Sequence, residues 1–200
     1  MGLKSLPFLA VRLILASGSP RRKALLEELG LDPLVRAVDI DEMPLPNERA
    51  DKYVERLAIE KGAASISNSN DVQVDDVVIS ADTIVVLDDE LLGKPTNDGH
   101  ATEMLRRLSG RTHQVMTGVA VHRADEATSF VESTTVHFAE LSEADIAWYV
   151  GTGEPADKAG SYAMQGRGGA FVTAIEGSYD NVIGLPRYRL RPFIAAEMFD

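Results

Sequence analysis

Hydrophobic residues follow two patterns along this chain: short continuous runs, typical of buried strands, and stripes at helical spacing. The runs predict strands at residues 13–16, 34–38, 77–87, 90–92, 115–121, 131–138 and 170–175. The stripes predict helices at residues 20–29, 49–65, 98–108 and 143–150, and a final helix near Pro186. This alternation predicts an α/β fold that leans to α+β, with a mixed sheet, because some strands adjoin through short turns. No repeat or linker interrupts the pattern, so residues 1–200 are expected to form a single domain.

The segment after the first strand has the features of an anion-binding helix N-terminus. Ser19 stands at the N-cap position, and Pro20 stands at the first helical position, where its missing N–H does no harm. Free backbone N–H groups, the positive end of the helix dipole and the side chains of Arg21 and Arg22 would then meet. The segment predicts a phosphate site, and a solvated arginine pair on an ordinary helix is the alternative.

The predicted strand at residues 77–87 contains one carboxylate. The run is apolar and β-branched except for Ser80, Asp82 and Thr83. A carboxylate among such neighbours is unfavourable unless it is paired, hydrogen-bonded or bound to a metal. Asp82 is therefore the first candidate for a catalytic or metal-binding residue, and a bulge that exposes an ordinary aspartate is the alternative.

Three further charged segments have both a functional and an ordinary interpretation. The acidic stretch at residues 39–42 is either a divalent-cation site or a solvated face. Lys61 either binds a substrate or complements the dipole at the end of its helix. Lys94, between a glycine and a proline, either reaches a phosphate from its loop or is a surface lysine.

Composition narrows the functional classes. The 200 residues carry a formal net charge of −11, which argues against a polymeric nucleic-acid partner but allows a small nucleotide in a local cationic cluster. The absence of cysteine excludes disulfides, a thiol nucleophile and a thiolate metal site. No apolar stretch has the length of a membrane span, and the N-terminus lacks a convincing signal peptide, so we expect a cytoplasmic location and no membrane partner.

A series of short motifs occurs in a fixed order over residues 13–187. They are Leu15–Arg22, Glu60-Lys61, Ala81-Asp82-Thr83, Gly93-Lys94-Pro95, Lys158-Ala159-Gly160, Gln165-Gly166, Gly177-Ser178-Tyr179 and Val182–Pro186. This ordered set resembles the Maf family of nucleoside triphosphate pyrophosphatases. The resemblance implies an elongated, twisted mixed sheet flanked by helices, a fold related to the inosine triphosphate pyrophosphatases. It also implies a homodimer. The family is linked to septum formation in bacteria, which implies a role in removing non-canonical nucleotides and in arresting cell division.

Three positions in these motifs resemble the branch of the family that acts on dTTP and UTP. They are Arg21, Thr83 and Gln165. The sister branch, which acts on 7-methylated GTP, has a bulky residue at the first of these positions, Gln at the second and Glu at the third. The amide of Gln165 can both donate and accept, which suits the edge of uracil or thymine. The resemblance implies hydrolysis of both nucleotides to the monophosphate and pyrophosphate.

This reaction needs an activated water and neutralisation of the triphosphate charge. The resemblance makes Asp82 the proton acceptor, a ligand of the divalent cation, or both, with Glu42 as the second carboxylate on the cation. Mg²⁺ is the expected cation, with Mn²⁺ or Co²⁺ as alternatives. The two carboxylates would repel each other, so we expect their proximity to require this metal. The expected substrate-binding residues are Ser19, Arg21, Arg22, Lys61, Thr83, Lys94, Lys158 and Gln165.

Two other functions are compatible with these residues. One is a pyrophosphatase mainly for modified pyrimidine triphosphates, such as 5-methyl-UTP or pseudo-UTP. The other is a nucleotide-binding regulator of septum formation with little catalysis. The presence of Asp82, Glu42 and Lys94 together favours an enzyme, because a regulator needs no residues that activate water.

Overall fold

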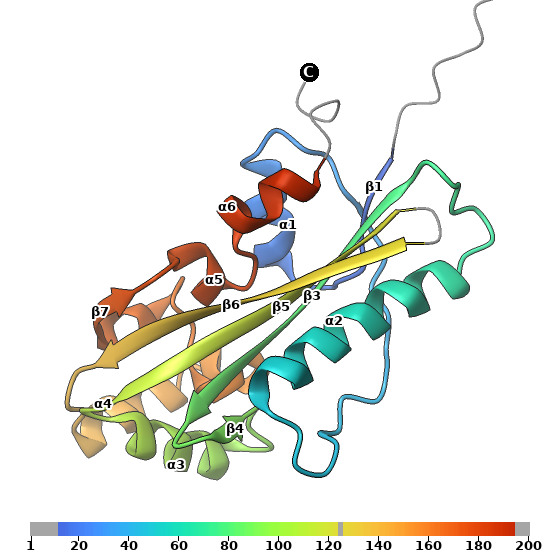
Figure 1. Cartoon of the computed structure of the whole chain (residues 1–200). Helices are drawn as coiled ribbons and strands as arrows, with labels where there is room; N and C mark the ends of the chain where they lie inside the picture. Colours follow the sequence, from blue (N-terminus) through green and yellow to red (C-terminus); the bar gives the residue numbers. More distant parts are fainter. Residues whose placement is uncertain (1–11, 124–125, 195–200) are drawn as a thin grey trace, which may run out of the picture.

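The computed structural model describes residues 12–123 and 126–194, and its core is one twisted sheet (Figure 1). The N-terminal residues that are expected to lack a signal peptide lie outside these residues, as does Asp125, between the strands predicted at 115–121 and 131–138. The strands are β1 (Leu13–Leu15), β2 (Leu34–Val35), β3 (Val77–Leu87), β4 (Glu90–Leu92), β5 (Thr112–Arg123), β6 (Glu126–Phe138) and β7 (Val172–Glu176).

The sheet is mixed, as predicted. Its strand order is β2-β1-β3-β5-β6-β7, and β4 pairs with β3 outside this path. The pairs β1–β2 and β1–β3 are parallel, whereas β3–β4, β3–β5, β5–β6 and β6–β7 are antiparallel. The long hairpin of β5 and β6 gives the sheet its elongated shape (Figure 1).

Helices cover both faces of the sheet. The α-helices are α1 (Pro20–Glu27), α2 (Ala50–Ser67), α3 (Asp98–Leu108), α4 (Glu143–Val150), α5 (Tyr179–Ile183) and α6 (Arg187–Leu190). Shorter 3-10 turns lie at Glu154–Asp157, Ala159–Ser161, Arg167–Phe171 and Arg191–Phe193. Among the described residues, no helix has both the length and the apolar character needed to cross a membrane.

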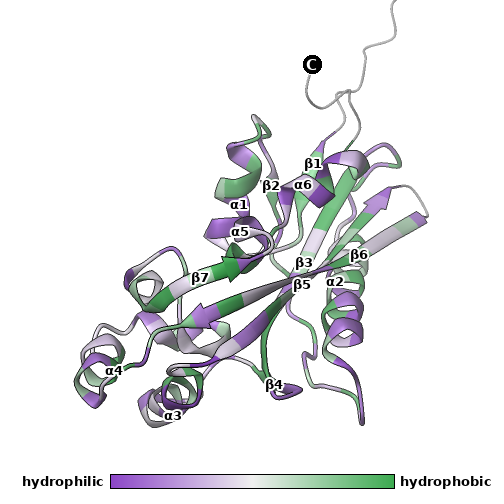
Figure 2. Cartoon of the chain, turned by 60° about the vertical axis from the view of Figure 1, so that its left-hand side comes forward, coloured by the Kyte–Doolittle hydropathy of each residue, from purple (hydrophilic) through white to green (hydrophobic). Residues whose placement is uncertain are grey.

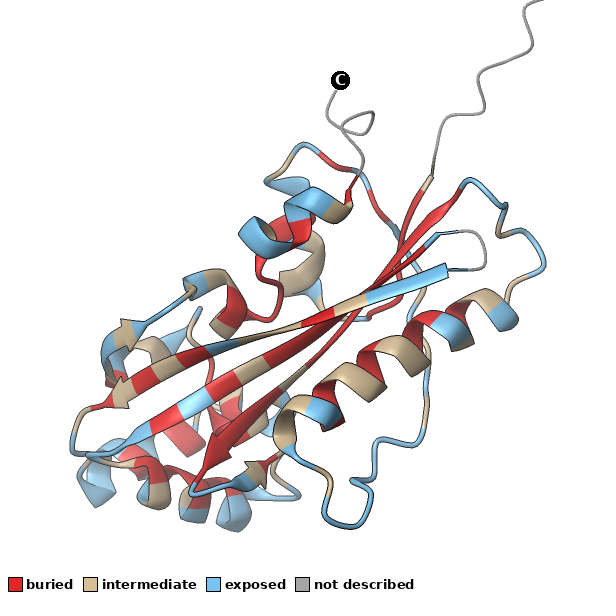
Figure 3. Ribbon diagram, in the orientation of Figure 1, coloured by how far each residue is buried: buried red, intermediate tan, exposed pale blue. Residues whose placement is uncertain are grey.

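Side-chain alternation along β3 explains this arrangement. Even-numbered residues such as Ile84 pack with Leu57 of α2, whereas odd-numbered residues such as Ile79 pack with Leu25 of α1. All of β3 is buried except the half-buried Thr83 (Figure 3), which fits its continuous apolar run. In Figure 2, α2 carries both apolar and hydrophilic residues, as expected for a helix with one face on a sheet.

One glycine allows α2 to lie close to the sheet. A Cβ atom at Gly118 in β5 would stand 2.2 Å from the carbonyl oxygen of Val54 in α2. Such a contact would displace the helix backbone, so this position needs a residue without a side chain.

The predicted N-cap at Ser19 is confirmed, and a second cap begins α4. The Ser19 Oγ accepts a hydrogen bond from the Arg22 N–H at 3.5 Å, and Pro20 begins α1. Ser142 and Asp145 form the reciprocal capping box of α4.

Several predicted boundaries are wrong. The strand predicted at residues 34–38 is only the two-residue β2, because β1 offers just three residues for pairing. The hairpin strands are longer than their apolar runs, because cross-strand pairing continues through polar positions. Residues 170–171 belong to a 3-10 turn that precedes β7. No helix was predicted at residues 179–183, where the structure has α5, with the Ser178 Oγ accepting from the Asn181 N–H.

Candidate active site

One edge of β3 is open between its two short partners. Strand β1 pairs with Val77–Ile79, and β4 pairs with Val85–Leu87 on the same edge. No other strand in the described part of the chain covers residues 80–84 on this side, whereas β5 covers the opposite edge. A cavity of about 650 Å³ lies at this opening, so the short lengths of β1 and β4 create the space for a ligand.

All but one of the expected site residues line this cavity. They are Ser19, Arg21, Arg22, Glu42, Lys61, Asp82, Thr83, Lys94 and Lys158. Gln165 does not line it: the side chain is exposed, one residue beyond Met164, which does. The structure therefore brings together segments that are far apart in the sequence, and it leaves Gln165 outside the cavity lining, next to Met164 in the chain.

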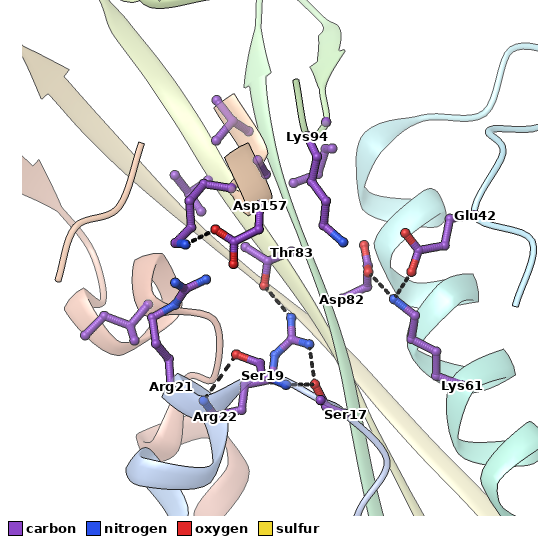
Figure 4. Close-up of a pocket in the computed structure, with 18 of the residues that line it drawn as sticks. Ser17, Ser19, Arg21, Arg22, Glu42, Lys61, Asp82, Thr83, Lys94 and Asp157 are labelled. Carbon is purple, nitrogen blue, oxygen red and sulfur yellow. Dashed lines mark hydrogen bonds and ion pairs between the residues drawn. The ribbon is translucent and has the colours of Figure 1, made fainter. Parts of the chain in front are cut away.

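The side chains of Asp82 and Thr83 lie on opposite sides of the cavity. Consecutive side chains of a strand point to opposite faces, so Asp82 points toward α2 and Thr83 toward α1 (Figure 4). Asp82 contacts Lys61 of α2, and Thr83 contacts Arg22 of α1. The open edge of β3 gives both side chains access to the same cavity.

On the α2 side, Lys61 lies between two carboxylates. The Lys61 Nζ is 2.7 Å from the Asp82 Oδ1 and 2.6 Å from the Glu42 Oε1. Lys61 and Asp82 are nearly buried, with side-chain exposures of 11% and 12%, whereas Glu42 is 45% exposed. The sequence did not indicate that the Lys61 ammonium would lie between the two carboxylates, where it offsets part of the repulsion that we expected a metal to relieve.

Charge and burial act against each other at Glu42. Burial raises the pKa of this carboxyl group, but the hydrogen bond and charge of Lys61 lower it more, so the pKa lies below its ordinary value of 4.5. Tyr53 of α2 donates its hydroxyl to the Glu42 carbonyl at 2.9 Å. Burial, together with the charges of Asp82 and Glu42, raises the pKa of Tyr53 to about 12. Tyr53 therefore stays a donor at neutral pH and anchors the Glu42 backbone.

The two carboxylates leave oxygens available for a hard cation. No hydrogen bond or ion pair within residues 12–123 and 126–194 reaches the second oxygen of Asp82 or of Glu42. That part of the chain contains no group of three or more His, Cys, Asp or Glu ligands. Mg²⁺ keeps several waters and binds through one or two carboxylates plus substrate phosphates. The donor set fits a cation that a bound triphosphate helps to hold.

On the α1 side, Arg22 links three segments. Its Nε donates to the Gly184 carbonyl at 2.9 Å, its Nη1 to the Ser17 Oγ at 3.0 Å, and its Nη2 to the Thr83 Oγ1 at 3.0 Å. These bonds use three of the five guanidinium N–H groups. Arg22 therefore ties the turn before α1, the strand β3 and the turn after α5 together, and two N–H groups are left over.

The hydroxyl of Thr83 continues this network through the sheet. Thr83 Oγ1 lies 2.9 Å from Thr117 Oγ1, and Thr117 donates its hydroxyl to the Asn181 carbonyl at 3.0 Å. Because the Thr117 proton is used there, Thr83 is the donor in the first bond and accepts only from Arg22. Asn181 is fully buried and donates to the Val115 carbonyl and the Thr134 hydroxyl. In this structure Thr83 therefore holds Arg22 in place.

The other cations of the cavity differ in how they are paired. Lys158 forms an ion pair with Asp157, which also lines the cavity. Arg21 and Lys94 form no hydrogen bond through their side chains, and no ion pair, with any residue that the structure describes. Arg21 points into the cavity beside Asp157 (Figure 4), so its guanidinium is available to a ligand.

Four residues of this site were not singled out in the sequence: Ser17, Thr117, Asp157 and Asn181. Asp157 directly precedes the Lys158-Ala159-Gly160 motif, so its position was an available signal. Thr117 is a polar residue in an apolar run, which is the argument that identified Asp82. Nothing in the sequence indicated that Asn181 would be buried beneath this threonine.

Comparison with known proteins places the whole described site in one family. Residues 12–197 match the family model described as "Maf-like protein". The chain belongs to the Maf family. Among curated Maf relatives, the "dTTP/UTP pyrophosphatase" of Anaeromyxobacter dehalogenans (strain 2CP-C) is 52% identical over 182 residues, 89% of this chain and 90% of the relative. The protein of that name from Shewanella denitrificans is 50% identical over 190 residues, 92% of this chain and 96% of the relative.

A solved structure with partial similarity is that of the Staphylococcus aureus Ham1 protein. The alignment has a TM-score of 0.46 and 18% sequence identity, and it covers 64% of this chain and 72% of that one.

Proposed function

We propose that this Maf-family chain is a pyrophosphatase that hydrolyses dTTP and UTP to the nucleoside monophosphate and pyrophosphate. The names of relatives about half identical to it over most of its length support this activity. The observation that carries the proposal is the cavity at the open edge of β3. There the carboxylates of Asp82 and Glu42 face the same space as Arg21 and Lys94, which have no described partners.

In the proposed mechanism, Asp82 accepts a proton from the attacking water through its second oxygen. Lys61 fixes the carboxylate by binding its first oxygen at 2.7 Å. Lys94, Arg21, Lys158 and the remaining N–H groups of Arg22 bind the triphosphate, together with the backbone at the start of α1 after Ser19. These cations neutralise the charge that develops on the phosphates during attack.

The proposal includes a divalent cation on Asp82 and Glu42. When bound, Mg²⁺ supplies charge neutralisation and lowers the pKa of a coordinated water. Mn²⁺ and Co²⁺ accept the same oxygen ligands and are the alternatives. Lys61 contacts one oxygen of each carboxylate, and the second oxygens of Asp82 and Glu42 would bind the cation.

Base selection is assigned to Arg21, Thr83 and Gln165, the three residues that resemble the dTTP/UTP branch. Gln165 reads the donor and acceptor edge of the pyrimidine, and its exposed side chain next to the cavity-lining Met164 supports that role. Thr83 acts through Arg22, because its hydroxyl donates its proton to Thr117 and accepts from Arg22.

A panel assay for pyrophosphate release, with each divalent cation in turn, tests this function. We expect dTTP and UTP to be turned over faster than purine triphosphates, and Gln165→Glu to reduce that preference. Higher rates with 5-methyl-UTP or pseudo-UTP would favour the modified nucleotides as substrates. No release from any triphosphate would favour the non-catalytic regulator of septum formation.

The proposal extends to a cytoplasmic homodimer in which residues 1–200 act as a single domain. The resemblance to the family supports the dimer, and the net charge of −11 supports a small-molecule partner over a nucleic acid. Size-exclusion chromatography with light scattering measures the mass of the protein in solution. The mass of a monomer at the concentrations used in the assay would contradict the proposed dimer.

A further inference from the structure

A short loop at residues 163–168 runs from the cavity to the exposed surface. Met164 lines the cavity, and Gln165 is exposed beside it. Two side chains outside the loop hold both of its ends. The Ala163 N–H donates to the Tyr149 Oη at 3.1 Å, and the Gly168 N–H donates to the Glu154 Oε1 at 3.0 Å.

Tyr149 and Glu154 form one hydrogen-bonded unit. The Tyr149 hydroxyl donates to the Glu154 Oε1 at 2.8 Å, and the Arg167 N–H donates to the Glu154 Oε2 at 3.0 Å. Glu154 thus accepts three hydrogen bonds, which a carboxylate can do without any donor of its own. Tyr149 is fully buried, so the unit is anchored in the core below the loop.

At two positions of the loop, an added side chain would force this unit to shift. A Cβ atom at Gly166 would stand 2.6 Å from the Glu154 Oε1, and one at Gly168 would stand 2.5 Å from the Tyr149 Oη. Glycine at both positions allows the backbone to bind the carboxylate directly. The direction in which Gln165 leaves the loop is therefore set by Tyr149 and Glu154.

We propose that Tyr149 and Glu154 are positioning residues for base selection: they hold the 163–168 loop so that Gln165 meets the pyrimidine edge. This inference rests on the proposed function. Neither residue lines the cavity, so neither touches the triphosphate or the attacking water. Their loss disturbs recognition of the base more than hydrolysis itself.

Glu154→Gln is the main variant. The amide of glutamine replaces one carboxylate oxygen by an NH₂ group, which cannot accept a hydrogen bond. In either orientation this NH₂ faces at least one of the three donors, so at least one of the three bonds is lost. Tyr149→Phe is the second variant and removes the hydroxyl that joins Ala163 to Glu154. Glu132→Gln is the matched control, because Glu132 lies on β6 and its 2.9 Å ion pair is with Arg189 of α6, which is not part of this unit.

The readout is the ratio of kcat/KM for UTP to kcat/KM for CTP, whose pyrimidine edge has the opposite donor and acceptor pattern. We expect both variants to lower this ratio about tenfold or more, mainly through a higher KM for UTP, and the control to leave it unchanged. Amide hydrogen exchange should become faster at residues 163–168 in both variants.

An unchanged ratio in folded variants, or an equal loss with both nucleotides, overturns the positioning role. Unaltered exchange in the loop also overturns it. If the wild-type protein turns over neither dTTP nor UTP, the proposed function fails, and the exchange experiment still decides whether this unit holds the loop.

Discussion

The two sides of the cavity use polar residues in opposite ways. On the α1 side, Arg22, Thr83 and Thr117 form a network in which each hydroxyl has a defined donor and acceptor. On the α2 side, Asp82 and Glu42 share one lysine and keep an oxygen each for the cavity. The hydroxyl network fixes the position of Arg22, and the carboxylates of the α2 side keep oxygens available for a ligand. The alternation of side chains along β3 separates these two tasks.

Asp82→Asn removes the reactive group of the α2 side and should have the largest effect. We expect kcat for UTP to fall by about 10²–10⁴-fold, because the amide cannot accept the proton from water. The matched control is the exposed Asp88→Asn, which should retain activity. A fully active Asp82→Asn protein would contradict the role of this carboxylate.

The variants Arg22→Lys and Arg21→Lys test two adjacent arginines, of which only Arg22 forms side-chain hydrogen bonds with described residues. A lysine cannot replace the three directed bonds of Arg22, so we expect the free energy of unfolding to fall by about 2–3 kcal/mol, with loss of activity. Arg21→Lys should change stability by less than about 0.5 kcal/mol and raise the KM for UTP. Denaturant unfolding and steady-state kinetics measure both, and equal stability of the two variants would contradict the distinction.

Thr117→Val interrupts the network behind Thr83 without touching the cavity. Its loss leaves the Asn181 carbonyl and the Thr83 hydroxyl without their partner, so we expect destabilisation of about 1–3 kcal/mol. KM for UTP should rise through the displaced Arg22, while the pH profile of kcat stays as in the wild type. Thr135→Val, on the neighbouring strand β6, serves as a control.

The smallest effect concerns acid stability. Glu42 has a lowered pKa, so its contribution to stability is present above its ordinary value of 4.5 and is lost as pH falls through the lower value. Glu42→Gln should therefore reduce the difference in stability between neutral pH and about pH 3, slightly, because the side chain is half exposed. Urea unfolding at both pH values measures this difference, and an unchanged difference would exclude Glu42 as a contributor.

The order and type of the main elements could be predicted from local patterns. The Ser19 cap, the strand of Asp82 and the helix of Lys61 depend on neighbouring residues, and the structure has all three. The long hairpin was underestimated because its polar positions are stabilised by pairing across strands, which local composition does not reveal.

The partners of the site residues could not be predicted in the same way. Lys61 was expected among the substrate-binding residues, but the sequence did not indicate that it would contact both Asp82 and Glu42. Thr83 contacts Arg22 across 61 residues of sequence, and Thr117 contacts Asn181 across 64. Such contacts depend on packing between distant segments, and a single sequence carries little information about them.

Hydrolysis of UTP in water enriched in the heavy isotope of oxygen tests the central claim most directly. If Asp82 delivers water to the α-phosphate, mass spectrometry will find the heavy atom in UMP, and the pyrophosphate will carry none. Heavy oxygen in pyrophosphate, or release of UDP and orthophosphate, would show attack at another phosphorus and contradict the account.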